Sequence, residues 1–301
     1  MLDFLKARPQ IKALQSRIAK NIITTEAKAA RKASSSAMEE MMIDYNPHKG
    51  NIFSWQHHET VVDFLRRLPI EDSATQSFDG WLWVSVPTIN ASQLDHKRNT
   101  DVDAFSEGGV QLLEAFRAHR TKIERASEGK APATVTKRMR PYREQLEDDL
   151  LALAVKMSTT CGKWMLFPLT DDLPRTWRLV AEATAAGKLG PTSKVATYDP
   201  SSAKDERVIC VYTYDFTDNA DVRRVLDHLN ELGLITGQGI YYKCDAYSYL
   251  DIKSKNPYGL KASMYSSKEL LEGNAKAKKE GPIVRVKKDS AAVVGGDGWE
   301  F

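Results

Sequence analysis

The chain has 301 residues, of which 42% are hydrophobic and 28% are charged, and these values are typical of a globular protein that buries a full core. Its formal net charge of +3 is too small to indicate nucleic-acid binding by itself, so only local clusters of charge can support that function. No stretch approaches the roughly 20 consecutive apolar residues of a membrane-spanning helix, and we expect a soluble, unsecreted protein with no membrane partner.

The three cysteines, Cys161, Cys210 and Cys244, lie far apart in apolar segments. None of them belongs to a CxxC pair or to a Cys/His spacing of the kind that binds zinc. We interpret them as buried thiols in a reducing compartment, and we expect no metal and no cofactor. The predicted location is the cytoplasm, with the nucleus as an alternative.

Residues 1–45 are predicted to form a basic, partly disordered arm. The first 36 residues contain eight Lys or Arg residues but only two acidic residues, Asp3 and Glu26. A mitochondrial transit peptide has a similar composition, but a solvated basic arm is the commoner source of such a run. We therefore favour the arm over mitochondrial import.

The ordered part of the chain is predicted to begin at about residue 46, with a short helix and then a strand. Thr60 begins an amphipathic helix that buries Phe64 and its neighbours, and Pro69 ends it. Residues 78–87, FDGWLWVSVP, open with a turn and continue as a strand rich in aromatic and branched side chains.

Two long helices are expected next, near residues 107–125 and 142–157, with a loop over 127–136. The second half alternates strands with helices, and capping residues and terminal glycines predict helices over 172–187 and 218–233. The predicted strands of this half are 162–167, 193–198, 207–214, 239–245 and 247–251.

These elements predict an α+β protein with helices packed on one face of a mainly antiparallel sheet. A single domain is expected over residues 46–272. Residues 273–301 are rich in Lys, Ala and Gly and carry little apolar material, so we expect a disordered tail there.

The sequence lacks the motifs of the common enzyme classes: it has no GxSxG, no HExxH, no Walker loop and no GxGxxG between strand and helix. His57 and His58 are adjacent, so their side chains point apart on either a helix or a strand and do not suit one metal ion. Function must therefore be sought in the pattern of polar side chains along the strands.

Lysines on three predicted strands carry the strongest functional signal. Side chains alternate between the two faces of a strand, and Lys163, Lys194 and Lys243 each lie on the face away from apolar neighbours. If the strands share a sheet, these lysines converge on its open side, where Arg207 and Tyr212 could join them. Lys, Arg and Tyr are the residue types that bind phosphate. The alternative is an ordinary solvated face, which commonly displays Lys and Tyr.

Tryptophans and a basic run give two further hypotheses. Trp81 and Trp83 lie on the same side of their strand and could provide a stacking platform for a nucleic-acid base, whereas Trp164 and Trp177 are expected in the core. The segment TKRMRPYR, residues 136–143, could contact a phosphate backbone or act as a nuclear-localisation signal, although a solvated helix entrance is commoner.

Several segments of the second half resemble one known family. They are GKWMLF at 162–167, DDLPRTW at 171–177, GKLGPTSKVATYD at 187–199, VYTYDFTDNADVRRVLDHL at 211–229 and YYKCDAYSYLD at 241–251. The family is the basophilic leukaemia expressed protein family, conventionally described as a domain of unknown function, and the resemblance covers roughly residues 80–270. It implies a fold similar to that of translation initiation factor 4E, in which helices pack on the convex side of a strongly curved antiparallel sheet. Cap binding does not follow from it, because Trp81, Trp83 and Trp164 do not align with the cap-stacking pattern.

Some relatives in that family are labelled phosphothreonine lyases, which remove phosphate by β-elimination. The resemblance implies Lys194 as the catalytic base, with Lys163, Arg207 and Lys243 as phosphate contacts. Where such lyases have a Lys-x-His pair, this chain has Met165 two residues after Lys163, so a tyrosine, Tyr198 or Tyr212, would have to replace the acid.

Three functions are consistent with these observations. The first is a protein that binds a phosphorylated ligand, such as a nucleotide, an RNA end or a phosphopeptide, on the concave face of the sheet through Lys163, Lys194, Arg207, Tyr212 and Lys243. The second is a phosphothreonine-lyase-like enzyme, and the third is a noncatalytic interaction scaffold with basic arms. We favour the first.

Overall fold

The computed structural model describes residues 42–71, 80–197 and 205–272. Most of the expected N-terminal arm and the whole expected tail, 273–301, lie outside these ranges. The chain divides into two compact units, one of residues up to Tyr45 together with Thr88–Arg98, the other of residues 46–87 and those from 99 onward. Among the described residues, no helix combines the length and the apolar character needed to cross a membrane.

The first unit contains a two-stranded sheet and one helix. Strand β1 (Met42–Asp44) pairs antiparallel with β3 (Thr88–Asn90), and helix α3 (Ala91–Arg98) follows directly. Asn90 caps this helix, because its side chain accepts a bond from the Gln93 N–H at 2.8 Å while the Gln93 side chain accepts one from the Asn90 N–H at 3.0 Å. The short sheet therefore runs straight into a well-capped helix.

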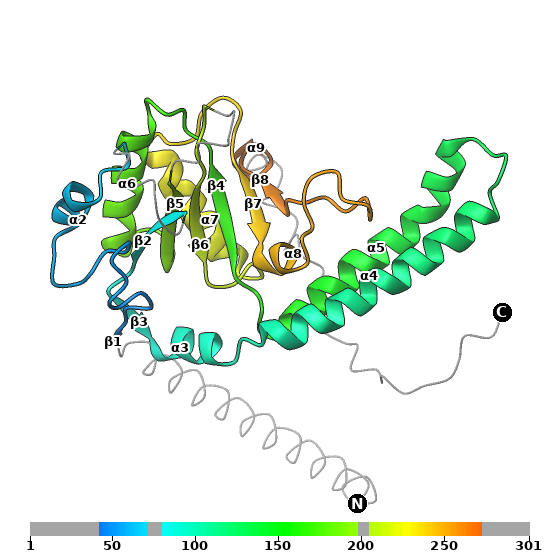
Figure 1. The fold of residues 1–301 in the computed structure, drawn as a ribbon, viewed down its shortest axis with the longest axis horizontal. Coiled ribbons are helices and arrows are strands. Elements are labelled where there is room, and N and C mark those ends of the chain that lie inside the picture. Colours follow the sequence, from blue (N-terminus) through cyan, green and yellow to red (C-terminus); the bar gives the residue numbers. More distant parts are fainter. Residues whose placement is uncertain (1–41, 72–79, 198–204, 273–301) are drawn as a thin grey trace, which may run out of the picture. The chain divides into compact units, whose positions relative to one another are not determined.

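The second unit is built on a six-stranded sheet in which every neighbouring pair is antiparallel (Figure 1). The strand order is β2, β5, β6, β4, β7, β8, so β2 and β8 form the two edges. Their bounds are Trp81–Ser85 (β2), Gly162–Leu166 (β4), Thr192–Ala196 (β5), Ile209–Thr213 (β6), Tyr241–Cys244 (β7) and Tyr265–Ser266 (β8). The predicted α+β class with a mainly antiparallel sheet is confirmed, whereas strong curvature and likeness to 4E stay predictions.

One face of this sheet is covered by helices α6 (Leu173–Ala185) and α7 (Asn219–Glu231), which pack against β2, β5 and β6. The strands turn fully buried side chains such as Leu82, Trp164 and Val195 toward these helices. The Trp164 indole N–H donates to the backbone carbonyl of Val222 on α7 at 3.0 Å, which joins sheet and helix in the core. Helix α2 (Val61–Arg67) packs on α6 and begins after Thr60, close to the predicted start. The Thr60 hydroxyl caps it by accepting from the Asp63 N–H.

Helices α4 (Val102–Arg125) and α5 (Pro132–Lys156) lie side by side as an antiparallel pair (Figure 1). The two predicted helices are confirmed, but α5 begins ten residues before the predicted 142. Pro132 starts it, in the first turn, where the missing N–H has no intrahelical acceptor anyway, and Pro141 lies inside the helix instead of bounding it. The predicted loop over 127–136 is correspondingly shorter.

The predicted strand over 247–251 is wrong. The chain instead forms helix α8 (Asp245–Tyr249) directly after β7. Ala246, Tyr247 and Leu250 are buried, and their spacing suits one face of a helix that packs against α4 and α5. A last helix, α9 (Ser267–Glu272), follows β8.

Candidate functional site

Strand register brings two of the predicted lysines next to each other. Lys163 on β4 lies directly opposite Tyr212 on β6 on one side and directly opposite Lys243 on β7 on the other. Directly paired residues of antiparallel strands have their side chains on the same face of the sheet. Lys163, Lys243 and Tyr212 therefore form a row across three neighbouring strands.

The third lysine continues this surface toward the sheet edge. Lys194 on β5 lies opposite Cys210 on β6 and opposite Trp83 on β2. Cys210 precedes Tyr212 by two residues and so shares its face, as Trp81 shares the face of Trp83. We call this surface the lysine face. Its residues are Trp81, Trp83, Lys163, Lys194, Cys210, Tyr212 and Lys243.

Aromatic rings surround the Lys194 ammonium group. Its Nζ lies 3.9 Å from the ring centroid of Trp81, 4.6 Å from that of Trp83 and 5.7 Å from that of Tyr212. Cation–π attraction favours the charged form here. Burial acts in the opposite direction and, together with the positive charge of Lys163, lowers the pKa of Lys194 below its ordinary value. Lys194 is thus a half-buried ammonium group held against two indoles.

Lys163 is held by an acidic partner. Its ammonium group forms an ion pair with Asp245 at the start of α8, and only 12% and 13% of the two side chains are exposed. The Asp245 N–H donates to the carbonyl of Cys161 at 2.8 Å, so the carboxylate is fixed relative to β4. Lys163 Nζ also lies 5.3 Å from the Tyr212 ring centroid. The ion pair compensates one of the three positive charges of the lysine face.

The remaining lysine is affected by its neighbour. Burial, and then the charge of Lys163, lowers the pKa of Lys243. The lysine face therefore brings together three ammonium groups, and the charge of Lys163 lowers the pKa of the other two; Asp245 is the nearby carboxylate.

The tyrosine and the cysteine of the lysine face are both protonated at neutral pH. Burial raises the pKa of Tyr212 far above its ordinary value, so its hydroxyl stays protonated and can donate a hydrogen bond. Burial also raises the pKa of Cys210 to about 11, which excludes a thiolate nucleophile there at neutral pH.

A family model described as basophilic leukemia-expressed protein Bles03 matches residues 7–251 of the chain, which include every residue of the lysine face. The chain belongs to the Bles03 family. The resemblance read from the second half of the sequence is therefore confirmed. The match also includes Asp245, the ion-pair partner of Lys163.

Not every predicted site residue of this Bles03 chain reaches the lysine face. Arg207 donates from its guanidinium to the carbonyl of Ile70 at 3.1 Å and from its backbone N–H to the carbonyl of Pro168 at 3.2 Å. Pro168 follows the end of β4, whereas Lys163 stands near the beginning of that strand. The structure thus does not bring Arg207 together with the three lysines, and its role as a phosphate contact stays a prediction.

Of the other candidate residues, some lie on the lysine face and others lie in the core or on the covered side of the sheet. Tyr198 lies outside the described residues. Arg223 and Arg224 belong to α7, on the covered side of the sheet, where they pair with Asp227 and Asp221. Trp164 and Trp177 are fully buried, as predicted, and Trp81 and Trp83 share one face of β2, also as predicted. In the described ranges, His, Cys, Asp and Glu residues do not gather into a group of three that could hold a metal ion.

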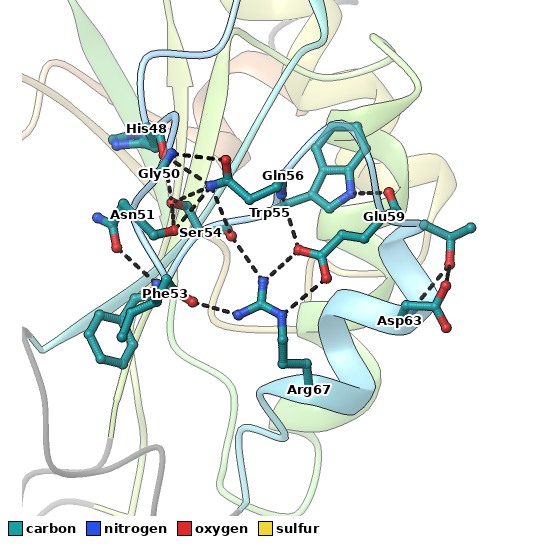
Figure 2. A network of polar contacts seen from close by, with 12 residues as sticks. His48, Gly50, Asn51, Phe53, Ser54, Trp55, Gln56, Glu59, Asp63 and Arg67 are labelled. Atoms are coloured by element: carbon teal, nitrogen blue, oxygen red, sulfur yellow. Dashed lines mark hydrogen bonds and ion pairs between the residues drawn. The ribbon is translucent and has the colours of Figure 1, made fainter.

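A loop network supports the edge of the lysine face (Figure 2). The Arg67 guanidinium bonds both carboxylate oxygens of Glu59, at 2.5 and 3.0 Å, and the carbonyls of Ile52 and Ser54. Burial is the largest single effect on the Glu59 carboxylate and raises its pKa, but the bonds from Arg67 and from the Gln56 backbone N–H, together with neighbouring positive charge, outweigh burial and lower the pKa below its ordinary value. Arg67 thereby fixes the loop that precedes α2.

The same loop reaches Trp83. The Trp55 N–H donates to the Trp83 carbonyl at 2.9 Å, the Trp83 N–H donates to the Phe53 carbonyl at 3.1 Å, and the His48 ring lies 4.6 Å from the Trp83 ring. Sequence reasoning missed His48 and the pairing role of Asp245. Asp245 continues the alternation of Tyr241 and Lys243, which was the available signal, whereas nothing in the sequence indicates that His48 meets Trp83.

Proposed function

We propose that this protein binds a phosphorylated ligand, a nucleotide or an RNA end, on the lysine face. The observation that carries the proposal is the strand register. It pairs Lys163 with Lys243 and places Lys194, which lies over the indole rings of Trp81 and Trp83, on the same face. Ammonium groups that are partly buried and repel one another gain the most from an anion placed between them. A phosphate dianion supplies that charge, and the protonated Tyr212 hydroxyl supplies a hydrogen bond to it.

Asp245 limits which anion binds well. Its carboxylate repels an incoming phosphate, but it also holds Lys163 in a fixed position without ligand. A weakly charged anion would not compensate the lysines enough to overcome that repulsion, whereas a dianionic phosphate would. The proposal therefore expects binding to strengthen with the charge of the phosphate group.

Trp81 and Trp83 favour a ligand that carries an aromatic base. Both rings are partly exposed on the lysine face, and the Lys194 ammonium group occupies the space over them. A base stacked on either ring contributes roughly 1–3 kcal/mol. In this arrangement the base replaces Lys194 over the indole, and the freed ammonium group turns to the phosphate.

A thermal-shift screen of the full chain tests the proposal. The probes are nucleoside mono- and triphosphates, a short 5′-phosphorylated RNA, a phosphopeptide and inorganic phosphate. A ligand at about 100 times its Kd stabilises the fold by roughly 2.7 kcal/mol. We expect a shift with the nucleotides or the RNA that Lys194→Ala and the Lys163→Ala/Lys243→Ala double variant abolish.

Lys188→Ala is the matched control, because Lys188 is an exposed lysine of the same unit outside the lysine face. It should keep the full shift. If no probe gives a shift, or if a shift survives the variants of the lysine face, the proposal fails, and an interaction scaffold becomes the better explanation.

The lowered pKa of Lys194 favours one second candidate, a β-elimination enzyme. In that reaction neutral Lys194 takes the α-proton of phosphothreonine, the electron pair forms the Cα–Cβ double bond, and phosphate leaves from Cβ. Met165, paired with Cys210, occupies the position where a histidine acid would stand. The product would be lighter than the phosphopeptide by about 98 mass units, the mass of phosphoric acid. Mass spectrometry of a phosphothreonine peptide incubated with the protein tests this candidate, and an unchanged mass excludes it.

A further inference from the structure

The end of α4, the loop after it and the beginning of α5 form a strongly basic segment, residues 117–143, which we call the basic hairpin. It contains nine Lys or Arg residues but only two acidic ones, whereas the whole chain has 43 basic and 40 acidic residues. About a tenth of the chain's length thus carries a net charge of +7, which exceeds the +3 of the whole chain. This segment contributes nothing to the lysine face.

The charges of the basic hairpin are largely exposed. Two arginines form ion pairs, Arg120 with Glu124 and Arg140 with Glu144, each at 2.7 Å and each open to solvent. Exposed pairs of this kind contribute little free energy and exchange readily for another anion. Within the described ranges, four further exposed basic residues of the hairpin form neither an ion pair nor a side-chain hydrogen bond. These are Lys122, Arg125, Lys130 and Lys137.

The two helices that carry these charges pack against each other. Phe116 of α4 and Met139 of α5 are buried, and the His119 ring lies 4.8 Å from the Tyr142 ring across the two helices. The Arg138 guanidinium donates to the Ser127 hydroxyl at 3.1 Å and ties the loop to α5. The charged side chains therefore project from fixed helical positions.

We propose that the basic hairpin binds nucleic acid through its phosphate backbone, independently of the lysine face and without reading sequence. Residues 117–125 rise by about 12 Å along α4, a length over which a duplex presents roughly seven phosphates. Six of the nine basic residues are arginines, whose planar groups fork onto phosphate oxygens. Basic residues on two neighbouring helices can therefore contact several phosphates of one nucleic-acid backbone.

An anionic membrane surface fits this segment less well. Helices that bind membranes combine basic residues with a band of large apolar side chains that enters the lipid. In residues 117–143, all of which the structure describes, Tyr142 is the one large hydrophobic residue that is exposed. A single ring that can stack on a base suits nucleic acid instead.

The test measures fluorescence anisotropy of labelled single-stranded RNA and duplex DNA with the full chain over a series of salt concentrations. The hairpin variant changes Lys122, Arg125, Lys130 and Lys137 to Gln, because these residues form no ion pair and Gln keeps the helix propensity. The control variant changes four exposed lysines elsewhere to Gln, namely Lys49, Lys156, Lys188 and Lys268. It removes the same number of charges.

We expect the hairpin variant to bind at least about tenfold more weakly near 0.1 M salt and to lower the slope of log affinity against log salt by about 3. The control variant should match the wild type, and so should Lys194→Ala with duplex DNA and with RNA that lacks a 5′-phosphate, because the lysine face is proposed to bind an RNA end. Circular dichroism verifies folding, and a Lys130→Glu/Lys137→Glu variant repeats the test if the first variant does not fold. Equal affinity and slope for the hairpin and control variants would overturn the proposal. So would displacement of the nucleic acid by poly-glutamate at equal charge concentration, which would assign the hairpin to an acidic protein.

Discussion

The two faces of the six-stranded sheet come from the same strands, yet one is apolar and covered by helices, whereas the other carries lysines. On β4, Trp164 and Leu166 are buried on the side of α6 and α7, whereas Lys163, the residue before Trp164, lies on the lysine face. On β5, Val195 is buried and Lys194 is not. The covered face consists of apolar side chains buried by packing, whereas the lysine face carries charged groups, which need partners when they are partly buried. Alternation along each strand therefore separates the apolar core from the lysine face.

The largest loss of stability is expected from a substitution on the covered face. Trp164→Ala should lower the free energy of unfolding by about 3–5 kcal/mol, because it opens a cavity and leaves the Val222 carbonyl without its donor. Trp83→Ala on the open face should cost at most about 2 kcal/mol, since its ring is already partly in water. Urea unfolding of both variants measures the contrast. Equal losses would show that the open face belongs to the core.

A backbone contact provides the next test. A Cβ added at Gly190 would lie 1.6 Å from the carbonyl oxygen of Tyr212, so the turn before β5 must move away from β6. Gly190→Ala should destabilise the protein by about 1–3 kcal/mol or more. Gly187→Ala is a useful comparison, because its Cβ meets nothing within 4 Å and any loss must come from its φ of +70°. Chemical denaturation compares them, and a smaller loss at Gly190 would contradict the close approach.

The ion pair of the lysine face should give an intermediate effect. Asp245→Asn leaves the Lys163 charge uncompensated in a mostly buried position and should cost roughly 1–3 kcal/mol. The double variant Lys163→Met/Asp245→Leu should recover most of this loss, because no charge is left unpaired. A double-mutant cycle measures the coupling. If Asp245→Asn is as stable as the wild type, the ion pair between Lys163 and Asp245 does not stabilise the fold.

The smallest effect concerns pH. The folded-state pKa of Lys194 is lowered, so between that pKa and its unfolded value the unfolded chain binds more protons, and stability rises with pH. Below both values Lys194 imposes its full cost. The stability advantage of Lys194→Met should therefore shrink as the pH rises from about 7 toward about 10. Thermal unfolding of the variant and the wild type across that range checks the trend, and an advantage that grows would reverse the sign.

Alternation along single strands was predictable, and the relation between strands was not. The period of two assigned Lys163, Lys194 and Lys243 to the polar side of their strands. Their meeting depends on the order β5, β6, β4, β7, which places sequence-distant strands together and has no local signal. Arg207 illustrates the limit, because the segment before β6 bonds Pro168 and Ile70 instead of extending the lysine row.

The predictions for α5 and α8 were wrong for a related reason. Pro141 reads as a helix breaker, but the packing of Met139 and Leu146 against α4 carries α5 through it. The segment after β7 reads as a strand, because its tyrosines have high strand propensity. Burial against α4 and α5 makes it a helix, so tertiary contacts override the local preference at both places.

The loop that Arg67 holds has a consequence for the solubility of the folded protein. An edge strand with unpaired backbone groups invites strands of other molecules to add to it, and this leads to aggregation. Phe53 and Trp55 bond the outward backbone groups of Trp83 in the middle of β2, so an incoming strand finds that position occupied. At the opposite edge, β8 is only two residues long. The ion pair of Arg67 with Glu59, which holds this loop, thus protects one side of the sheet against strand addition.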